Sequence, residues 1–261
     1  MIKEYLKGIW RDRYVLFALV NSDLKIKYRG SLLGIAWMIV TPLCLALILG
    51  VVFTTLFGAD PKTFIPRLYA ALNAWFFLSV SADSGAMSLI FSEGYLKQTT
   101  VNAQVFPLRP CMVNFVNLLL SMIVFFVVYV FLQPQYYNAK MLMAVPGICV
   151  AFVFTASWAV LASVIHLSFR DFQPFQSIVI QGLFYATPII YDASMLAERG
   201  FGLLYQLNPF YYIIDIMVKP MMGILLPSGR VYIAAICMTA LLFWISAKAF
   251  MRIKKDLALR F

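Results

Sequence analysis

Long apolar runs separated by short polar connections dominate the sequence. A membrane-spanning helix needs about 20 mainly apolar residues to cross a hydrocarbon core of about 30 Å. Runs of this length occur at roughly 32–57, 68–92, 108–132, 141–167, 173–191 and 231–250. The pattern therefore predicts an all-α integral membrane protein with about six transmembrane helices.

The first thirty residues follow a different pattern, with apolar side chains recurring every three or four positions between charged ones. This spacing predicts an amphipathic helix over 2–20 that lies in the membrane interface, with Trp10 at headgroup depth. Asn21, Ser22 and Asp23 are typical helix caps, so a new helix is expected to start at Leu24 after an elbow.

The stretch between the last two runs, 192–230, is too long for a tight turn and too apolar for a disordered segment. Asn208-Pro209 and Lys219-Pro220 interrupt it. Short re-entrant helices buried against other helices would satisfy their backbone groups there. We therefore expect one transmembrane domain over 1–261, composed of the interface helix and elbow (1–30), helices 1–5 (31–191), the outer re-entrant region (192–230), and helix 6 with a cytoplasmic tail (231–261).

Composition supports the membrane prediction, because 63% of the residues are hydrophobic and only 12% are charged. The net charge of +10 could indicate nucleic-acid binding, but the basic residues gather at the helix ends instead. Fourteen lie at the termini and in the connections after the second and fourth runs, and six lie in the opposite connections. Both termini are therefore expected to be cytoplasmic, and no nucleic acid is expected as a partner.

Catalytic motifs are missing from the sequence. No Gly-Lys pair occurs, so a phosphate-binding loop of the GxxxxGK[ST] type is excluded. The sequence contains no HExxH motif, no Ser/His/Asp set and no clustered carboxylates or cysteines that would indicate an enzyme or a metal site. We expect no catalytic residue, no metal and no cofactor in this chain.

Two titratable residues lie inside apolar runs. Asp83 could contact substrate or relay a proton, since charges at such depth are costly and usually functional. It could also tie helices together through Ser79, Ser81 and Ser84. His166, the single histidine, favours an interfacial packing role over a ligand or pH switch.

Two short connections predicted to be cytoplasmic carry charged residues. Segment 92–98 contains Glu93, Tyr95 and Lys97, and is either a solvated connection or a short helix that docks on a partner and carries its motion into the membrane. Arg170 and Asp171 lie in the turn after the fourth run. They either anchor two helix ends or contact the same cytoplasmic partner and receive its motion.

Aromatic residues make up 16% of the chain, and most of those at span ends fit an interfacial belt. Some of those within spans could face a central passage, where flat rings with polar edges suit sugars. The candidates for such a translocation path are Trp37, Phe184, Tyr185 and Tyr191. Lipid contact or packing is the alternative for each of them.

Several motifs, taken in order, resemble the permease subunits of polysaccharide ABC exporters of the ABC-2 type. They are Asp23-Leu-Lys-Ile-Lys-Tyr-Arg-Gly-Ser-Leu-Leu-Gly-Ile-Ala-Trp37 with Thr41-Pro42-Leu43, Val105-Phe-Pro-Leu-Arg-Pro110, Phe169-Arg-Asp171, Thr187-Pro-Ile-Ile-Tyr191 and Asn208-Pro209. The resemblance covers nearly the whole chain. It departs at Thr100-Val-Asn-Ala-Gln104, where the family usually has a Lys-Lys pair, so the exact coupling contacts stay open.

The resemblance implies a homodimer in the bacterial inner membrane that exports a lipid-linked polysaccharide, with O-antigen favoured. Two copies of a separate ABC ATPase would bind ATP and Mg, and the whole complex would be a translocase. Glu93, Tyr95, Lys97, Arg170 and Asp171 would then couple to the ATPase. Lys25, Lys27 and Arg29 would attract the substrate's phosphate head group, or serve as ordinary positive-inside anchors.

Other functions remain open at this level. Capsule and teichoic-acid exporters share the same plan, so the glycan is not determined. A membrane-embedded glycosyl or lipid transferase could use Asp83 and nearby arginines, but it would need a second carboxylate. An ion-coupled carrier would need charge pairs within spans, which the sequence lacks.

Overall fold

The computed structural model describes residues 2–30 and 34–254, and all regular structure within these ranges is helical. Five of these helices are long and apolar enough to cross a membrane. They are α3 (Trp37–Phe57), α4 (Pro61–Phe91), α6 (Val105–Leu132), α7 (Ala144–Ser168) and α12 (Gly229–Ile253). An all-α integral membrane protein is therefore confirmed. The tail 255–261 and residues 31–33 of the predicted first helix lie outside the described residues.

The predicted fifth span is shorter than expected. Helix α8 (Phe172–Ala186) has 15 residues and ends at Thr187, which has an extended backbone. At about 1.5 Å per residue it covers about 22 Å, less than a typical hydrocarbon core. Pro188 explains this end, because the residue before a proline is disfavoured in helical geometry.

The predicted position of the elbow in the N-terminal segment, at residues 21–23, is wrong. Two helices, α1 (Ile2–Arg11) and α2 (Arg13–Tyr28), meet at Asp12, and the expected caps Asn21, Ser22 and Asp23 lie inside α2. The Asp12 carboxylate accepts a hydrogen bond at 2.7 Å from the backbone N–H of Asn102. A tertiary partner therefore holds the bend, whereas the sequence suggested a local cap.

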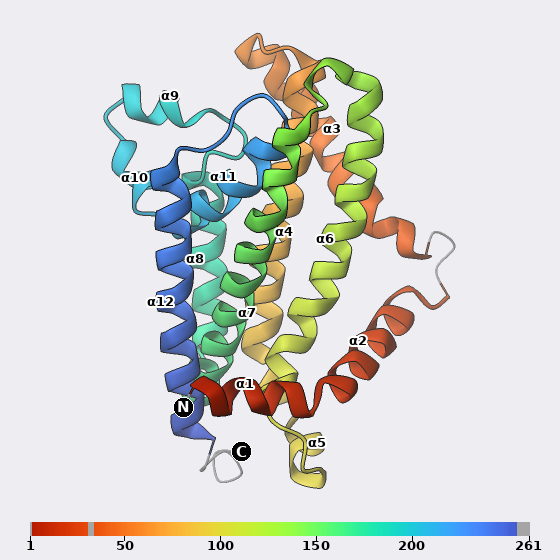
Figure 1. The fold of residues 1–261 in the computed structure, drawn as a ribbon, viewed down its shortest axis with the longest axis vertical. Helices are drawn as coiled ribbons and strands as arrows, with labels where there is room; N and C mark the ends of the chain where they lie inside the picture. Colours follow the sequence, from red (N-terminus) through yellow and green to blue (C-terminus); the bar gives the residue numbers. More distant parts are fainter. Residues whose placement is uncertain (1, 31–33, 255–261) are drawn as a thin grey trace.

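The bundle has two distinct ends (Figure 1). Helix α1, the short helix α5 (Glu93–Gln98), the turn between α7 and α8, and the last described residues of α12 lie at one end, which we call the base. The α3–α4 turn and the α6–α7 connection, which contains the 3₁₀ turns η2 (Pro134–Tyr136) and η3 (Ala139–Met143), lie at the opposite end, the far end. Another 3₁₀ turn, η1 (Gly34–Ala36), precedes α3.

Helix α4 is at the centre of the bundle and contacts α3, α6, α7, α8 and α11 (Pro209–Met221). Between α8 and α12 the chain forms three short helices, α9 (Ala193–Glu198), α10 (Gly202–Gln206) and α11. The first two are exposed, whereas α11 is buried against α4, α7 and α12. Asn208 caps α11 by accepting the N–H of Phe210 at 3.0 Å.

Candidate functional site

Helix α5 projects from the base of the bundle and exposes the residues predicted to contact an ATPase. Lys97 donates to Glu93 at 2.6 Å, one turn earlier on the same helix. Tyr95 packs edge-on against Phe106, with 5.6 Å between ring centroids, and remains accessible. A ring contact therefore seats this exposed helix on the start of α6.

Arg170 and Asp171 are both exposed in the turn between α7 and α8. This turn shares the base with α5, so the structure places both predicted coupling groups at one end of the molecule (Figure 1). A single partner surface at the base could reach both groups.

A contact that the sequence did not indicate joins α1 to the segment after α5. Besides the bond from Asn102 to Asp12, Arg11 donates to the carbonyl of Thr100 at 3.2 Å. Gly8 lies so close that an added Cβ would be 2.6 Å from the Asn102 amide nitrogen. Thr100–Gln104, the stretch that departs from the family pattern, is thus the surface on which α1 rests.

The Asp12 carboxylate is stabilised in its charged form. Hydrogen bonds from the Arg11 side chain, and then from the Asn102 backbone, hold the pKa of Asp12 below its usual value, although partial burial opposes this shift. The charged form therefore favours the docked position of α1.

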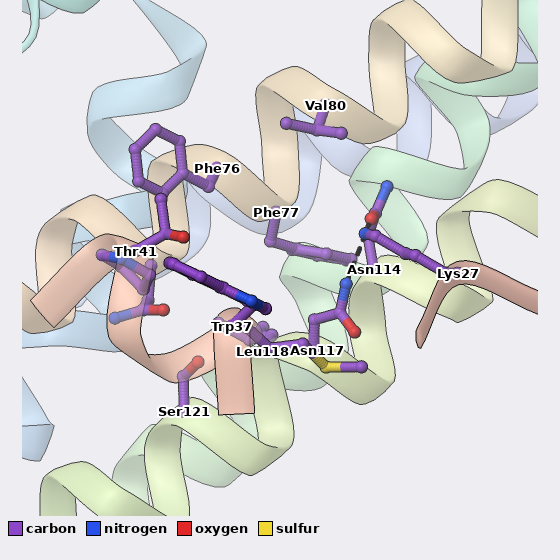
Figure 2. A pocket seen from close by; sticks show the side chains of 13 residues that line it. Lys27, Trp37, Thr41, Phe76, Phe77, Val80, Asn114, Asn117, Leu118 and Ser121 are labelled. Atoms are coloured by element: carbon purple, nitrogen blue, oxygen red, sulfur yellow. Dashed lines mark hydrogen bonds between the residues drawn. The ribbon is translucent and has the colours of Figure 1, made fainter. Parts of the chain in front are cut away.

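The basic residues Lys25, Lys27 and Arg29 are exposed along the last turn of α2 and just after it. Lys27 lines a cavity of about 280 Å³ that also contains Trp37, the first predicted path residue. Figure 2 shows Lys27 extending toward Asn114, and Trp37 sharing this space with Phe77. One residue of the predicted head-group site, Lys27, and one residue of the predicted translocation path, Trp37, therefore line the same cavity. Lys25 and Arg29 do not line it.

The other three predicted path aromatics lie near the C-terminal end of α8 or just after it, and none of them lines the cavity that contains Trp37. Phe184 packs against Trp75 and Tyr185, with centroid distances of 5.4 and 5.3 Å. The Tyr191 hydroxyl donates to the backbone carbonyl of Tyr185, whose ring is exposed. Within one chain, therefore, the four aromatics form two separate groups.

Asp83 contacts α8, and not the serines of its own helix that were one of the two alternatives for it. Its carboxylate accepts hydrogen bonds from Ser177 at 2.8 Å and from Gln176 at 3.3 Å. Asp83 also lines a cavity of about 500 Å³ near the base, together with Asp23 and Arg109. These contacts tie α4 to α8 beside an accessible space.

Asp23 and Arg109 form a two-pronged ion pair that joins α2 to the start of α6. Both residues belong to motifs that carry the family resemblance, but the sequence gave no indication that they pair. The arginine fork matches both carboxylate oxygens, which gives such a pair directional as well as electrostatic strength. It fixes the angle between α2 and the bundle.

His166 is buried, and its Nδ1 has no hydrogen-bond partner among the described residues. No group of three or more His, Cys, Asp or Glu side chains in the described part of the chain is arranged to hold a metal ion. Neither feature assigns a chemical role to the histidine.

The far end holds a larger cavity, of about 670 Å³, between the start of α4, α11 and the bent stretch after α8. Two ion pairs line it. Arg67 pairs with Asp192, and Lys219 pairs with Asp215 at 2.9 Å. The first pair attaches the segment before α9 to α4.

Comparison with known proteins identifies the class of this bundle. The family model of ABC-2 type transporters matches residues 14–222. The chain is 29% identical over 196 residues, 75% of each chain, to the O-antigen export system permease protein RfbA of Klebsiella pneumoniae. It is also 24% identical over 254 residues, 97% of each chain, to the protein of the same name in Myxococcus xanthus.

Proposed function

The chain belongs to the ABC-2 type transporter family, and from that premise we propose that it is the membrane-spanning permease of an O-antigen-type polysaccharide exporter driven by ATP. One observation carries this proposal. The relatives named O-antigen export permeases align with 75% and 97% of the chain.

The family implies an ABC ATPase subunit as partner, since its members are transport subunits of the membrane and are not themselves catalytic. We propose that two copies of this chain associate with two ATPase subunits, which bind ATP and Mg. The substrate would be a polysaccharide on a lipid carrier, moved outward across the bacterial inner membrane.

We assign the base to the cytoplasm. Basic residues concentrate at this end, as the positive-inside rule requires for short connections. Helices α7 and α12 both run toward the base, so the chain between them must return to the far end (Figure 1). Helix α8 covers about 22 Å of this return, and the bent residues 187–191 continue from its end, so we propose that this stretch is the sixth crossing.

The contacts at the base support a mechanical role. Helix α5 and the α7–α8 turn would receive the motion of the ATPase. Because Asp12 ties α1 to the segment after α5, the two interfacial elements would move together. Asp83, bonded to α8, would pass part of this motion from α4 to the helix that carries the exposed aromatic Tyr185.

Reconstitution with the ATPase in lipid vesicles tests this function. We expect Glu93→Gln, Tyr95→Ala and Arg170→Gln to reduce both ATPase stimulation and glycan export severalfold. Glu198→Gln and Arg199→Gln, which remove the same charges at the far end, should leave coupling unchanged.

Two results would count against this assignment. Normal coupling in all three base variants would mean that the ATPase binds elsewhere. Export of lipid-linked glycan by the permease without any ATPase would remove the basis of the proposed function.

A further inference from the structure

Helix α1 lies across the base of the bundle, from α12 toward the start of α6 (Figure 1). Near one end, Tyr5 is buried against Phe243 and Phe250 of α12, with centroid distances of 5.9 and 6.2 Å. At the other end, Asp12 accepts the backbone N–H of Asn102. The helix is therefore fastened at both ends, and its middle, around Gly8, rests on the segment between α5 and α6.

Gln104 lies beneath this middle part of α1. The residue is 0% exposed, and both its Oε1 and its Nε2 are buried without a hydrogen-bond partner among the described residues. It is the N-cap of α6, but its side chain makes no capping hydrogen bond. A Cβ added to Gly8 would be 2.8 Å from the Oε1, so α1 lies directly against the amide. The docked helix therefore covers an amide oxygen that has no other partner.

An amide buried in this way opposes the docking of α1. Burial without hydrogen bonds favours any state in which water reaches the amide, by about tenfold in the equilibrium constant. Gln176, a glutamine that is 3% exposed between α4, α7 and α8, shows the contrast. It accepts the indole N–H of Trp158 at 3.1 Å and donates to Asp83 at 3.3 Å. The bundle thus satisfies a buried glutamine where its helices stay together, and does not do so under α1.

We propose that α1 is a releasable strap, which alternates between the docked position and a position lifted off residues 100–104, where water reaches the Gln104 amide. While α1 is docked, it moves together with α5. Its release separates the two elements and lets the base return to its starting arrangement. The inference rests on the proposed function only for what drives the release, which is the ATPase acting on α5. The unfavourable contact itself is a property of this chain.

Hydrogen exchange of the purified permease in lipid nanodiscs tests the strap without any partner. A helix of 10 residues is marginal by itself, so the α1 amides exchange from the lifted state. We expect Gln104→Leu, and Gln104→Met with its closer shape, to slow this exchange about tenfold, because neither side chain gains from hydration. Gln176→Leu is the matched control. It should leave α1 exchange unchanged and lower the melting temperature, since it leaves Trp158 and Asp83 without this partner.

The complex with its ATPase tests whether α1 is released during transport. In the wild type, ATP turnover should raise the exchange of the α1 amides severalfold over the nucleotide-free complex, because the lifted state becomes more populated. Gln104→Leu favours the docked state, so it should show little of this rise. It should also export glycan severalfold more slowly, since the base returns to its starting arrangement only after release.

Three results would overturn the inference. Exchange of α1 that is unchanged or faster in both Gln104 variants, or failure of both variants to fold, would mean that the buried amide does not oppose docking. Equal slowing in Gln176→Leu would mean that the effect is not specific to the contact under α1. Export driven by ATP with constant α1 exchange would mean that α1 stays docked. A permease that no ATPase stimulates would contradict the proposed function instead, and exchange of the permease alone would still decide whether α1 is held as a strap.

Discussion

The close approach of α7 and α11 provides the sharpest test of the packing. A Cβ added to Gly147 would be 2.3 Å from the carbonyl oxygen of Ile216 and 2.9 Å from its carbon. Ordinary contacts between such atoms are about 3.5 Å, so Gly147→Ala must push the α11 backbone away by about 1 Å. Overpacking of this kind costs about 1–3 kcal/mol, and the better helix propensity of alanine returns at most about 1 kcal/mol.

Gly182 is the matched control, because it lies within α8 and an added Cβ there meets no atom within 4 Å. Gly182→Ala should be neutral or stabilising by up to about 1 kcal/mol. Thermal unfolding of the two variants in detergent should therefore give melting temperatures that differ by about 2–12 °C, with Gly147→Ala lower. If Gly147→Ala melts with or above Gly182→Ala, α11 does not pack against α7 as described.

The contacts of α1 and α2 yield three more predictions. Asp12→Ala should raise hydrogen exchange of the α1 amides about tenfold, because the bond to Asn102 is lost, while Glu4→Ala on the exposed face should not. Since the folded-state pKa of Asp12 lies below its usual 3.8, its contribution to docking is complete above pH 3.8 and is lost as the pH falls through the lower pKa. If exchange of the α1 amides rose with acid equally in the wild type and in Asp12→Asn, this reasoning would be wrong. Arg109→Gln should lower the free energy of unfolding by about 2 kcal/mol, and adding Asp23→Asn should recover part of it, which a double-mutant cycle of melting curves measures.

Parts of the candidate site were predictable because they depend on local chemistry. The polar character of 92–98 and the charges at Arg170 and Asp171 predicted exposed cytoplasmic connections, and the structure exposes both at one end. Their coupling role stays a prediction. The partners of Asp83 were not predictable, because Ser177 and Gln176 lie on another helix and nothing in the sequence gives its orientation.

The sequence alone determined the membrane class and placed five of its six predicted spans where the structure has long apolar helices, because the length and apolarity of a run decide whether it can cross a bilayer. Tertiary structure decided where the chain bends and which side chains meet. Asp12 breaks the first helix only because Asn102 lies against it, and Lys27 shares a cavity with Trp37 only because α2 folds back on the bundle. A helix that is apolar all round has no polar face to indicate its neighbours, so its rotation and partners are fixed by packing alone.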